Sequence, residues 1–128
     1  MTLRRVVIDV QGLFASAVND ILCKFDFGFA PVISKNPSKT ISLCEADISS
    51  VLIMDVMSYA PRSLEERLKI RDELKKTNPN CKIVLLVDEN TEKKLADKVR
   101  LAKKDGLIDN FIYGSVSATY LSAVIDTL

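Results

Sequence analysis

The sequence contains no histidine and no tryptophan among its 128 residues. Without histidine, the chain cannot carry a Ser-His-Asp or Cys-His catalytic arrangement, nor a zinc site that needs imidazole. Only four glycines are present, and their positions match neither the dinucleotide-binding nor the NTP-binding glycine motif. These absences argue against the enzyme classes that depend on such residues.

Cysteines are few and the charges are nearly balanced. Cys23, Cys44 and Cys81 are far apart and odd in number, so they indicate neither a CxxC redox pair nor a disulfide framework. We expect all three to be small buried side chains in a reducing compartment. The formal net charge is +1, which gives no electrostatic case for direct nucleic-acid binding or for a membrane surface.

Long hydrophobic runs are also missing. No window reaches the roughly 18 apolar residues that a membrane-spanning helix needs. Arg4 and Arg5 precede an apolar stretch, but Asp9 interrupts it early, which is unlike a secretory signal peptide. The length predicts one domain over 1–128, and we expect it to be cytoplasmic and without membrane contact.

Short apolar runs alternate along the chain with longer amphipathic stretches. The runs predict strands over 5–10, 27–34, 50–55, 82–87 and 109–113. A helix is expected after each strand: Ser63 and Glu66 have capping-box spacing at the start of the third, and Gly106 ends the fourth. The fifth is expected over 117–128. Pro31 places the second strand at a sheet edge.

The first, third and fourth strands lack polar alternation, which indicates that helices cover both of their faces. Because crossovers between parallel strands are right-handed, we predict an α/β fold with an open, doubly wound, five-stranded parallel sheet in the order 2-1-3-4-5. Helices are expected on both faces. In such sheets, ligands bind at the carboxyl ends of the central strands.

Two aspartates stand at those carboxyl ends. Asp9 ends the first strand and Asp55 ends the third, and adjacent parallel strands lie about 4.8 Å apart. Each could alone be a turn or helix-capping residue. Together, at the ends of the two central strands, they form a candidate Mg²⁺ site, because this cation prefers carboxylate oxygens.

At this point the chain resembles the receiver domains of two-component response regulators, which have a flavodoxin-like fold. The resemblance covers nearly the whole chain and includes the order of its elements. It rests on Val7-Ile-Asp9, on Val51-Leu-Ile-Met-Asp55, on Ile83-Val-Leu-Leu86 and on the segment from Gly106 to Ile112.

The resemblance implies a signalling module and not a metabolic enzyme. It implies that Asp55 accepts a phosphoryl group from a histidine kinase or phosphotransfer protein, to switch an output domain or partner. Asp9, Asp55 and the backbone carbonyl of Met57 would coordinate Mg²⁺. It also implies possible homodimer formation through the face of the fourth helix, fifth strand and fifth helix.

The chain departs from the family at its switch positions. Val10 stands where receivers usually carry a second acid, and Val87-Asp88 where they carry Ser or Thr. Tyr113-Gly114 stands where they carry a lysine. Fewer carboxylates hold a hard cation less tightly, and the missing ammonium removes a charge-assisted contact to the phosphoryl group. We therefore expect weak binding of Mg²⁺ and weak uptake of phosphoryl groups, unless Asp88 turns into the cleft.

The sequence leaves two other hypotheses about function open. The first is a pseudo-receiver: the same fold used as a phosphorylation-independent interaction or dimerisation module. The second is a small flavodoxin-like enzyme, against which the missing histidines and glycine motifs argue. Tyr113 could line the expected cleft or pack on the last helix, and the lysine-rich fourth helix is expected to present a solvated face.

Overall fold

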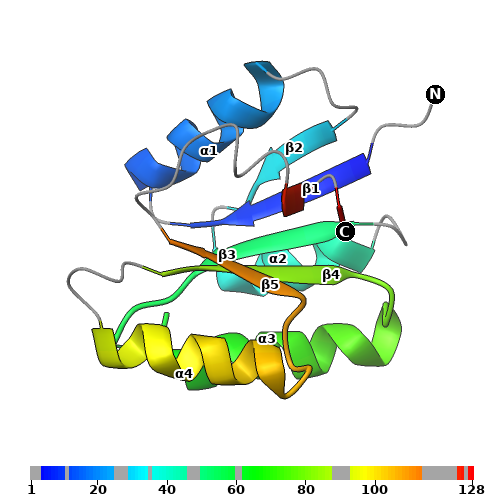
Figure 1. Ribbon diagram of the computed structural model, residues 1–128. Helices are drawn as coiled ribbons and strands as arrows, with labels where there is room; N and C mark the ends of the chain where they lie inside the picture. Colours follow the sequence, from blue (N-terminus) through cyan, green and yellow to red (C-terminus); the bar gives the residue numbers. More distant parts are fainter. Residues whose placement is uncertain are drawn as a thin grey trace.

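The computed structural model describes residues 4–10, 12–24, 29–34, 36–45, 50–59, 62–87, 93–113, 124–125 and 127–128. Five parallel strands form one sheet in the order β2-β1-β3-β4-β5 (Figure 1). This is the predicted strand order, so the predicted fold is confirmed. The strands are β1 (Arg4–Asp9), β2 (Phe29–Ile33), β3 (Val51–Asp55), β4 (Lys82–Val87) and β5 (Asn110–Tyr113).

The apolar, β-branched composition of the central strands explains their burial. All five residues of β3 are buried, as are the last five of β4 and the last four of β1. β2 contains Pro31 and is only half-buried, and it lies at the edge of the sheet, where a residue without an N–H is tolerated. The register sets Asp9 opposite Met54, and Asp55 opposite Leu86.

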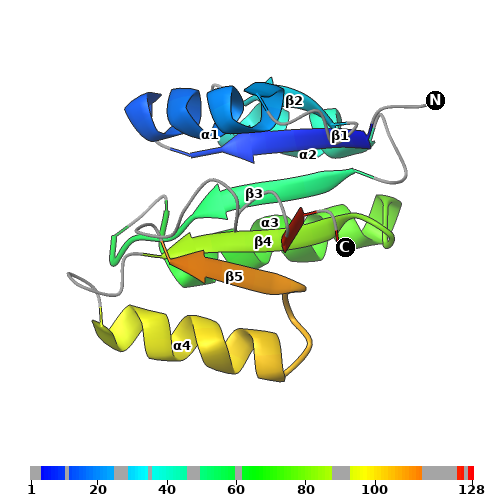
Figure 2. The same cartoon turned by 45° about the horizontal axis from the view of Figure 1, so that its top comes forward.

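Helices cover both faces of the sheet (Figures 1 and 2). On one face, α2 (Pro37–Glu45), α3 (Leu64–Thr77) and α4 (Lys93–Lys104) pack against Val7, Leu52 and Leu85. On the other, α1 (Gly12–Lys24) and the buried residues Val124 and Ile125 pack against Val6, Ile53 and Val84. Successive strand residues point to opposite faces, which explains the two separate apolar cores.

Local signals fix the ends of two helices as predicted. The Ser63 hydroxyl accepts a hydrogen bond from the Glu66 backbone N–H at 3.3 Å and so caps α3. Gly106 follows α4 with a φ of 78°, a left-handed conformation that favours glycine at a helix C-terminus. The backbone N–H of Leu107 then returns to the carbonyl of Ala102 at 3.0 Å.

Most of the fifth helix predicted over 117–128 lies outside the described residues. Val124 and Ile125 are helical and buried, and the structure describes four longer helices before them. None of the described helices has the length and apolar character that crossing a bilayer requires.

The cysteines differ in their surroundings. Cys44 and Cys81 are buried, as expected, but Cys23 is exposed, which corrects the expectation for that residue. Its position on α1 turns it away from the apolar residues that pack on the sheet. A hydrogen bond with Cys81 raises the pKa of the Cys44 thiol, and hydrogen bonds from Cys44 and Ser50 help lower the pKa of Cys81 to about 7.

Iodoacetamide should therefore alkylate Cys23 alone in the folded protein. A thiolate reacts only where the reagent can reach it, and Cys81 is fully buried despite its low pKa. Mass spectrometry of peptides after timed alkylation should show Cys44 and Cys81 labelled only once denaturant is added. Labelling of Cys81 at the rate of Cys23 would show that the protein opens at this point.

Candidate functional site

The two aspartates predicted from the strand ends lie together at the carboxyl edge of the sheet. Asp9 ends β1 and Asp55 ends β3, its hydrogen-bonded neighbour. Both are buried, with 2% and 4% of their surface exposed. A buried carboxylate is strongly disfavoured unless it is paired or hydrogen-bonded. Their partners therefore decide what this site can do.

Arg67 on α3 bridges the two carboxylates from within the protein. Its guanidinium is completely buried and donates to Asp9 Oδ2 at 3.0 Å and to Asp55 Oδ1 at 2.7 Å. It also donates from Nη2 to the Asp9 carbonyl at 3.1 Å and from Nε to the Asp55 carbonyl at 2.8 Å. All three guanidinium nitrogens thus bind the ends of β1 and β3. This contact set ties the first turn of α3 to both central strands.

Arg62 supplies a second cation at the same place. Its Nη1 donates to Asp55 Oδ1 at 2.6 Å and lies 3.7 Å from Asp9 Oδ1. The side chain is 22% exposed, so it covers the site from the solvent side. Two backbone hydrogen bonds shape the connection that carries it: Met57 N–H to the Arg62 carbonyl at 2.7 Å, and Arg62 N–H to the Tyr59 carbonyl at 3.1 Å.

Thr40 on α2 completes the contacts of Asp9. Its hydroxyl donates to Asp9 Oδ2 at 2.8 Å and lies 2.7 Å from the hydroxyl of Ser34. Both hydroxyl residues are buried. Asp9 is therefore held by α2 and α3 together, whereas Asp55 is held by α3 and the connection before it.

We call Asp9, Asp55, Arg62 and Arg67 the Asp–Arg cluster. Two carboxylates and two guanidinium groups give it no net formal charge. Charge-assisted hydrogen bonds of this kind are among the stronger ones in proteins, and removal of one member would leave a buried charge without its partner. The cluster is thus electrically neutral without any bound ion.

The residues of this cluster do not fit a Mg²⁺ ion in the arrangement described. Mg²⁺ needs free oxygens in a near-octahedral shell at about 2.0–2.1 Å, but Arg67 lies between the two carboxylates and already uses oxygens of both. Among the described residues, no group of three or more His, Cys, Asp or Glu side chains comes together. Val10, which follows Asp9, is buried and apolar.

The other residues singled out from the sequence are not all near the cluster. Met57 follows β3 and is half-buried, and Val87 is buried at the end of β4. Tyr113 ends β5 and accepts a hydrogen bond from Arg100 Nε of α4 at 3.0 Å. Its ring also meets Phe111 edge-on, with centroids 5.6 Å apart. Asp88 and Gly114 lie outside the described residues.

Sequence reasoning missed Arg62, Arg67 and Thr40. A signal for Arg67 exists: it lies three residues after Leu64 and seven before Leu74, both of which are buried on the same helix. A cation on the apolar side of a helix that directly follows a strand-end aspartate indicates an internal ion pair. Arg62 has no comparable signal, because its position depends on the connection between β3 and α3.

The chain matches no protein-family model and no curated protein. Solved structures do resemble it. A response regulator receiver domain protein from Clostridium thermocellum is 20% identical with a TM-score of 0.73, over 98% of this chain and 92% of that one. A response regulator from Thermotoga maritima is 18% identical with a TM-score of 0.72, over 100% of both chains.

A structure of adenylate cyclase from Rhodopirellula baltica is also similar, at 13% identity and a TM-score of 0.73, over 99% of this chain and 87% of that one. At such low identities the likeness concerns the fold. The strand order and the helices on both faces agree with it. This chain therefore has the fold of the response regulator receiver domains.

Proposed function

We propose that this chain is a receiver-fold protein-interaction module that works without Mg²⁺ and without a phosphoryl group on Asp55. One observation carries the proposal: Arg67 is fully buried between Asp9 and Asp55 and hydrogen-bonds to both carboxylates. An internal cation takes the role that a bound metal would otherwise have. The folded chain then needs no ion to hold these two carboxylates together.

The contacts of Asp55 also disfavour its use as a phosphoacceptor. In-line attack requires a carboxylate oxygen that a phosphoryl donor can approach. Asp55 is 4% exposed, and its Oδ1 accepts hydrogen bonds from Arg62 and Arg67 at 2.6 and 2.7 Å. Arg62 covers the cluster on its solvent side, so a donor would first have to displace it.

The face made by α4 and β5 suits a constant interaction surface. Arg100 holds Tyr113 by a hydrogen bond and lies over its ring at 5.7 Å, and Lys103 lies over Phe111 at 5.8 Å. Leu101 is 55% exposed on the same helix. These contacts join α4 to β5 without any group of the Asp–Arg cluster. We place the partner contact here, with a second copy of the chain or another signalling protein as the partner.

Phosphorylation of Asp55 by a histidine kinase stays a prediction of the family resemblance, and one experiment separates the two functions. The protein is incubated with acetyl phosphate and Mg²⁺, and its intact mass and sedimentation profile are then measured. We expect no phosphoryl adduct and an unchanged association state, because Arg62 covers Asp55 on its solvent side and Arg67 binds the same carboxylate from within the protein.

Asp55→Asn is the control for acyl phosphate formation, since it removes the acceptor and keeps nearly the same shape. Arg62→Ala tests the cover itself, and it should label more than the wild type. A wild-type adduct that Asp55→Asn abolishes, together with a changed sedimentation profile, would overturn the proposal and favour the phosphorylated receiver.

A further inference from the structure

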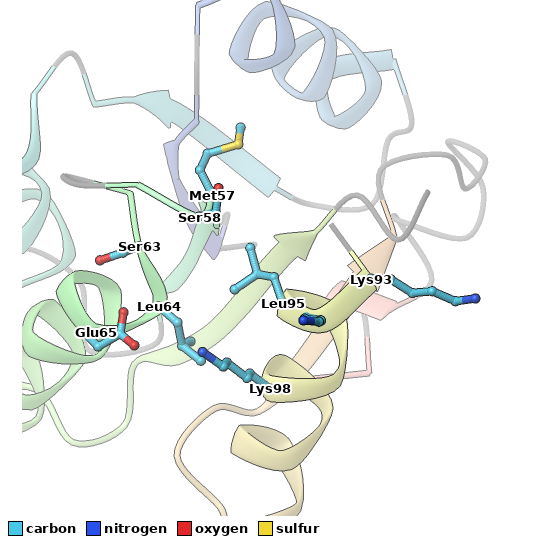
Figure 3. A pocket seen from close by; sticks show the side chains of 9 residues that line it. Met57, Ser58, Ser63, Leu64, Glu65, Lys93, Leu95 and Lys98 are labelled. Carbon is cyan, nitrogen blue, oxygen red and sulfur yellow. The ribbon is translucent and has the colours of Figure 1, made fainter. Parts of the chain in front are cut away.

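A cavity of about 470 Å³ lies between the first turns of α3 and α4, beside the residues that follow β3 (Figure 3). Small-molecule sites commonly have volumes of about 300–1,000 Å³. Met57, Leu64 and Leu95 give its lining an apolar part. Lys93, Lys94 and Lys98 give it a cationic part, and Glu65 is the acid among its lining residues.

The three lysines have no ionic partner among the described residues. Other cations on these helices do: Lys69 pairs with Glu66 on α3, and Arg100 pairs with Asp97 on α4. Lys93, Lys94 and Lys98 are exposed, and none lies within ion-pair distance of a carboxylate that the structure describes. Figure 3 shows Lys98 reaching from α4 toward Leu64, whereas Lys93 points outward.

The placement of these charges also opposes the helix electrostatics. Lys93 and Lys94 stand in the first turn of α4, which contains no acidic residue. The N-terminal end of a helix carries partial positive charge and favours anions, so cations there are unfavourable. The first turn of α3, which also lines the cavity, carries Glu65 and Glu66, so the excess of positive charge lies on the α4 side. An anion bound beside α4 would offset the positive charge of Lys93, Lys94 and the N-terminal end of that helix.

This cavity is separate from the Asp–Arg cluster. The guanidinium groups of Arg62 and Arg67 are directed to Asp9 and Asp55, and neither arginine is among the lining residues. A ligand bound to the lysines of α4 would therefore leave the buried ion pairs undisturbed. A ligand would contact both α3 and α4.

We propose that this cavity binds a small organic phosphate. The phosphate would be held by Lys94 and Lys98 and by the positive end of α4, since such groups bind phosphate well. The apolar part of the ligand would lie against Met57, Leu64 and Leu95. The combination of a cationic end and an apolar wall selects this class over a bare inorganic anion.

The probes are phenyl phosphate and inorganic phosphate, titrated into the full chain and followed by calorimetry. We expect phenyl phosphate to bind more tightly than inorganic phosphate, because only its ring can contact the apolar lining. The affinity should fall as salt is added, since exposed charges are screened. Equal affinities for the two probes, or binding of neither, would overturn the proposal.

Lys94→Gln with Lys98→Gln should weaken phenyl phosphate binding by about tenfold or more, because two charged contacts are lost. The matched control is Lys103→Gln with Lys104→Gln, which removes the same charge from the other end of α4 and should change the affinity less than about twofold. If both double variants weakened phenyl phosphate binding equally, the cause would be the change in net charge, and the proposed site would be contradicted.

Glu65→Gln provides a test in the opposite direction. It removes the acid from the cavity lining and should tighten phenyl phosphate binding severalfold. A comparison of unfolding midpoints verifies that each variant is folded. Unchanged or weaker binding by Glu65→Gln would contradict the proposed position of the phosphate.

Discussion

Arg67→Met is expected to lower the free energy of unfolding by about 3–5 kcal/mol, which is a large fraction of the stability of an ordinary domain. The side chain is fully buried and donates to both Asp9 and Asp55. Methionine would fill part of its volume but leave two buried carboxylates beside each other, with only Arg62 to neutralise them. Urea denaturation, analysed as a two-state transition, measures the loss.

Lys69→Met on the same helix is the matched control. Lys69 is 73% exposed and pairs with Glu66 across one turn, and exposed pairs contribute little to stability. Lys69→Met should change the free energy of unfolding by no more than about 0.5 kcal/mol. A second comparison combines Arg67→Met with Asp9→Asn and Asp55→Asn. The triple variant leaves Arg62, which is 22% exposed, as the only charge of the cluster. It should be more stable than Arg67→Met alone, because no fully buried charge is left unpaired.

Equal losses for Arg67→Met and Lys69→Met would show that the bridge contributes little to folding. The same conclusion would follow if the stability loss of the triple variant equalled the sum of the losses measured for its three single substitutions. Either result would remove the physical basis of the proposed metal-independent site.

Much of the fold could be predicted from the sequence, because the signals for it are local. The apolar runs of β1, β3 and β4 contain almost no polar residues, so both faces of these strands must be buried. Burial of both faces requires helices on each side of the sheet. Pro31 excluded its strand from the centre of the sheet, and Gly106 marked the end of α4 by its left-handed backbone. Right-handed crossovers then leave few possible strand orders.

The site could be predicted only in part. A carboxylate at the end of a buried strand is visible in the sequence, so Asp9 and Asp55 could both be found. Their partners come from α2, α3 and the connection after β3, and contacts at such separation follow from tertiary packing. An arginine on a helix is normally expected to face water, although its place between the buried residues Leu64 and Leu74 is a local sign to the contrary. The buried aspartates reverse that expectation.

Mg²⁺ should leave the unfolding midpoint of the wild-type protein unchanged and raise that of Arg67→Met. In the wild type, Arg67 occupies the space between the two carboxylates and, with Arg62, neutralises their charge. Its removal frees oxygens of Asp9 and Asp55, which suit a hard cation. Binding to the folded state alone stabilises it by about 1–3 kcal/mol when Mg²⁺ exceeds its Kd ten- to a hundredfold.

Thermal unfolding in MgCl₂ and in NaCl of equal ionic strength measures this effect and separates it from charge screening. Asp55→Asn in the Arg67→Met background is the second control, and it should remove most of the stabilisation, because one of the two carboxylates is lost. If Mg²⁺ raised the wild-type midpoint as much as that of Arg67→Met, Arg67 would not exclude the ion. The ion would then have to bind carboxylate oxygens that Arg67 leaves free. In that case a metal-binding receiver site would explain the two aspartates better than the metal-independent one.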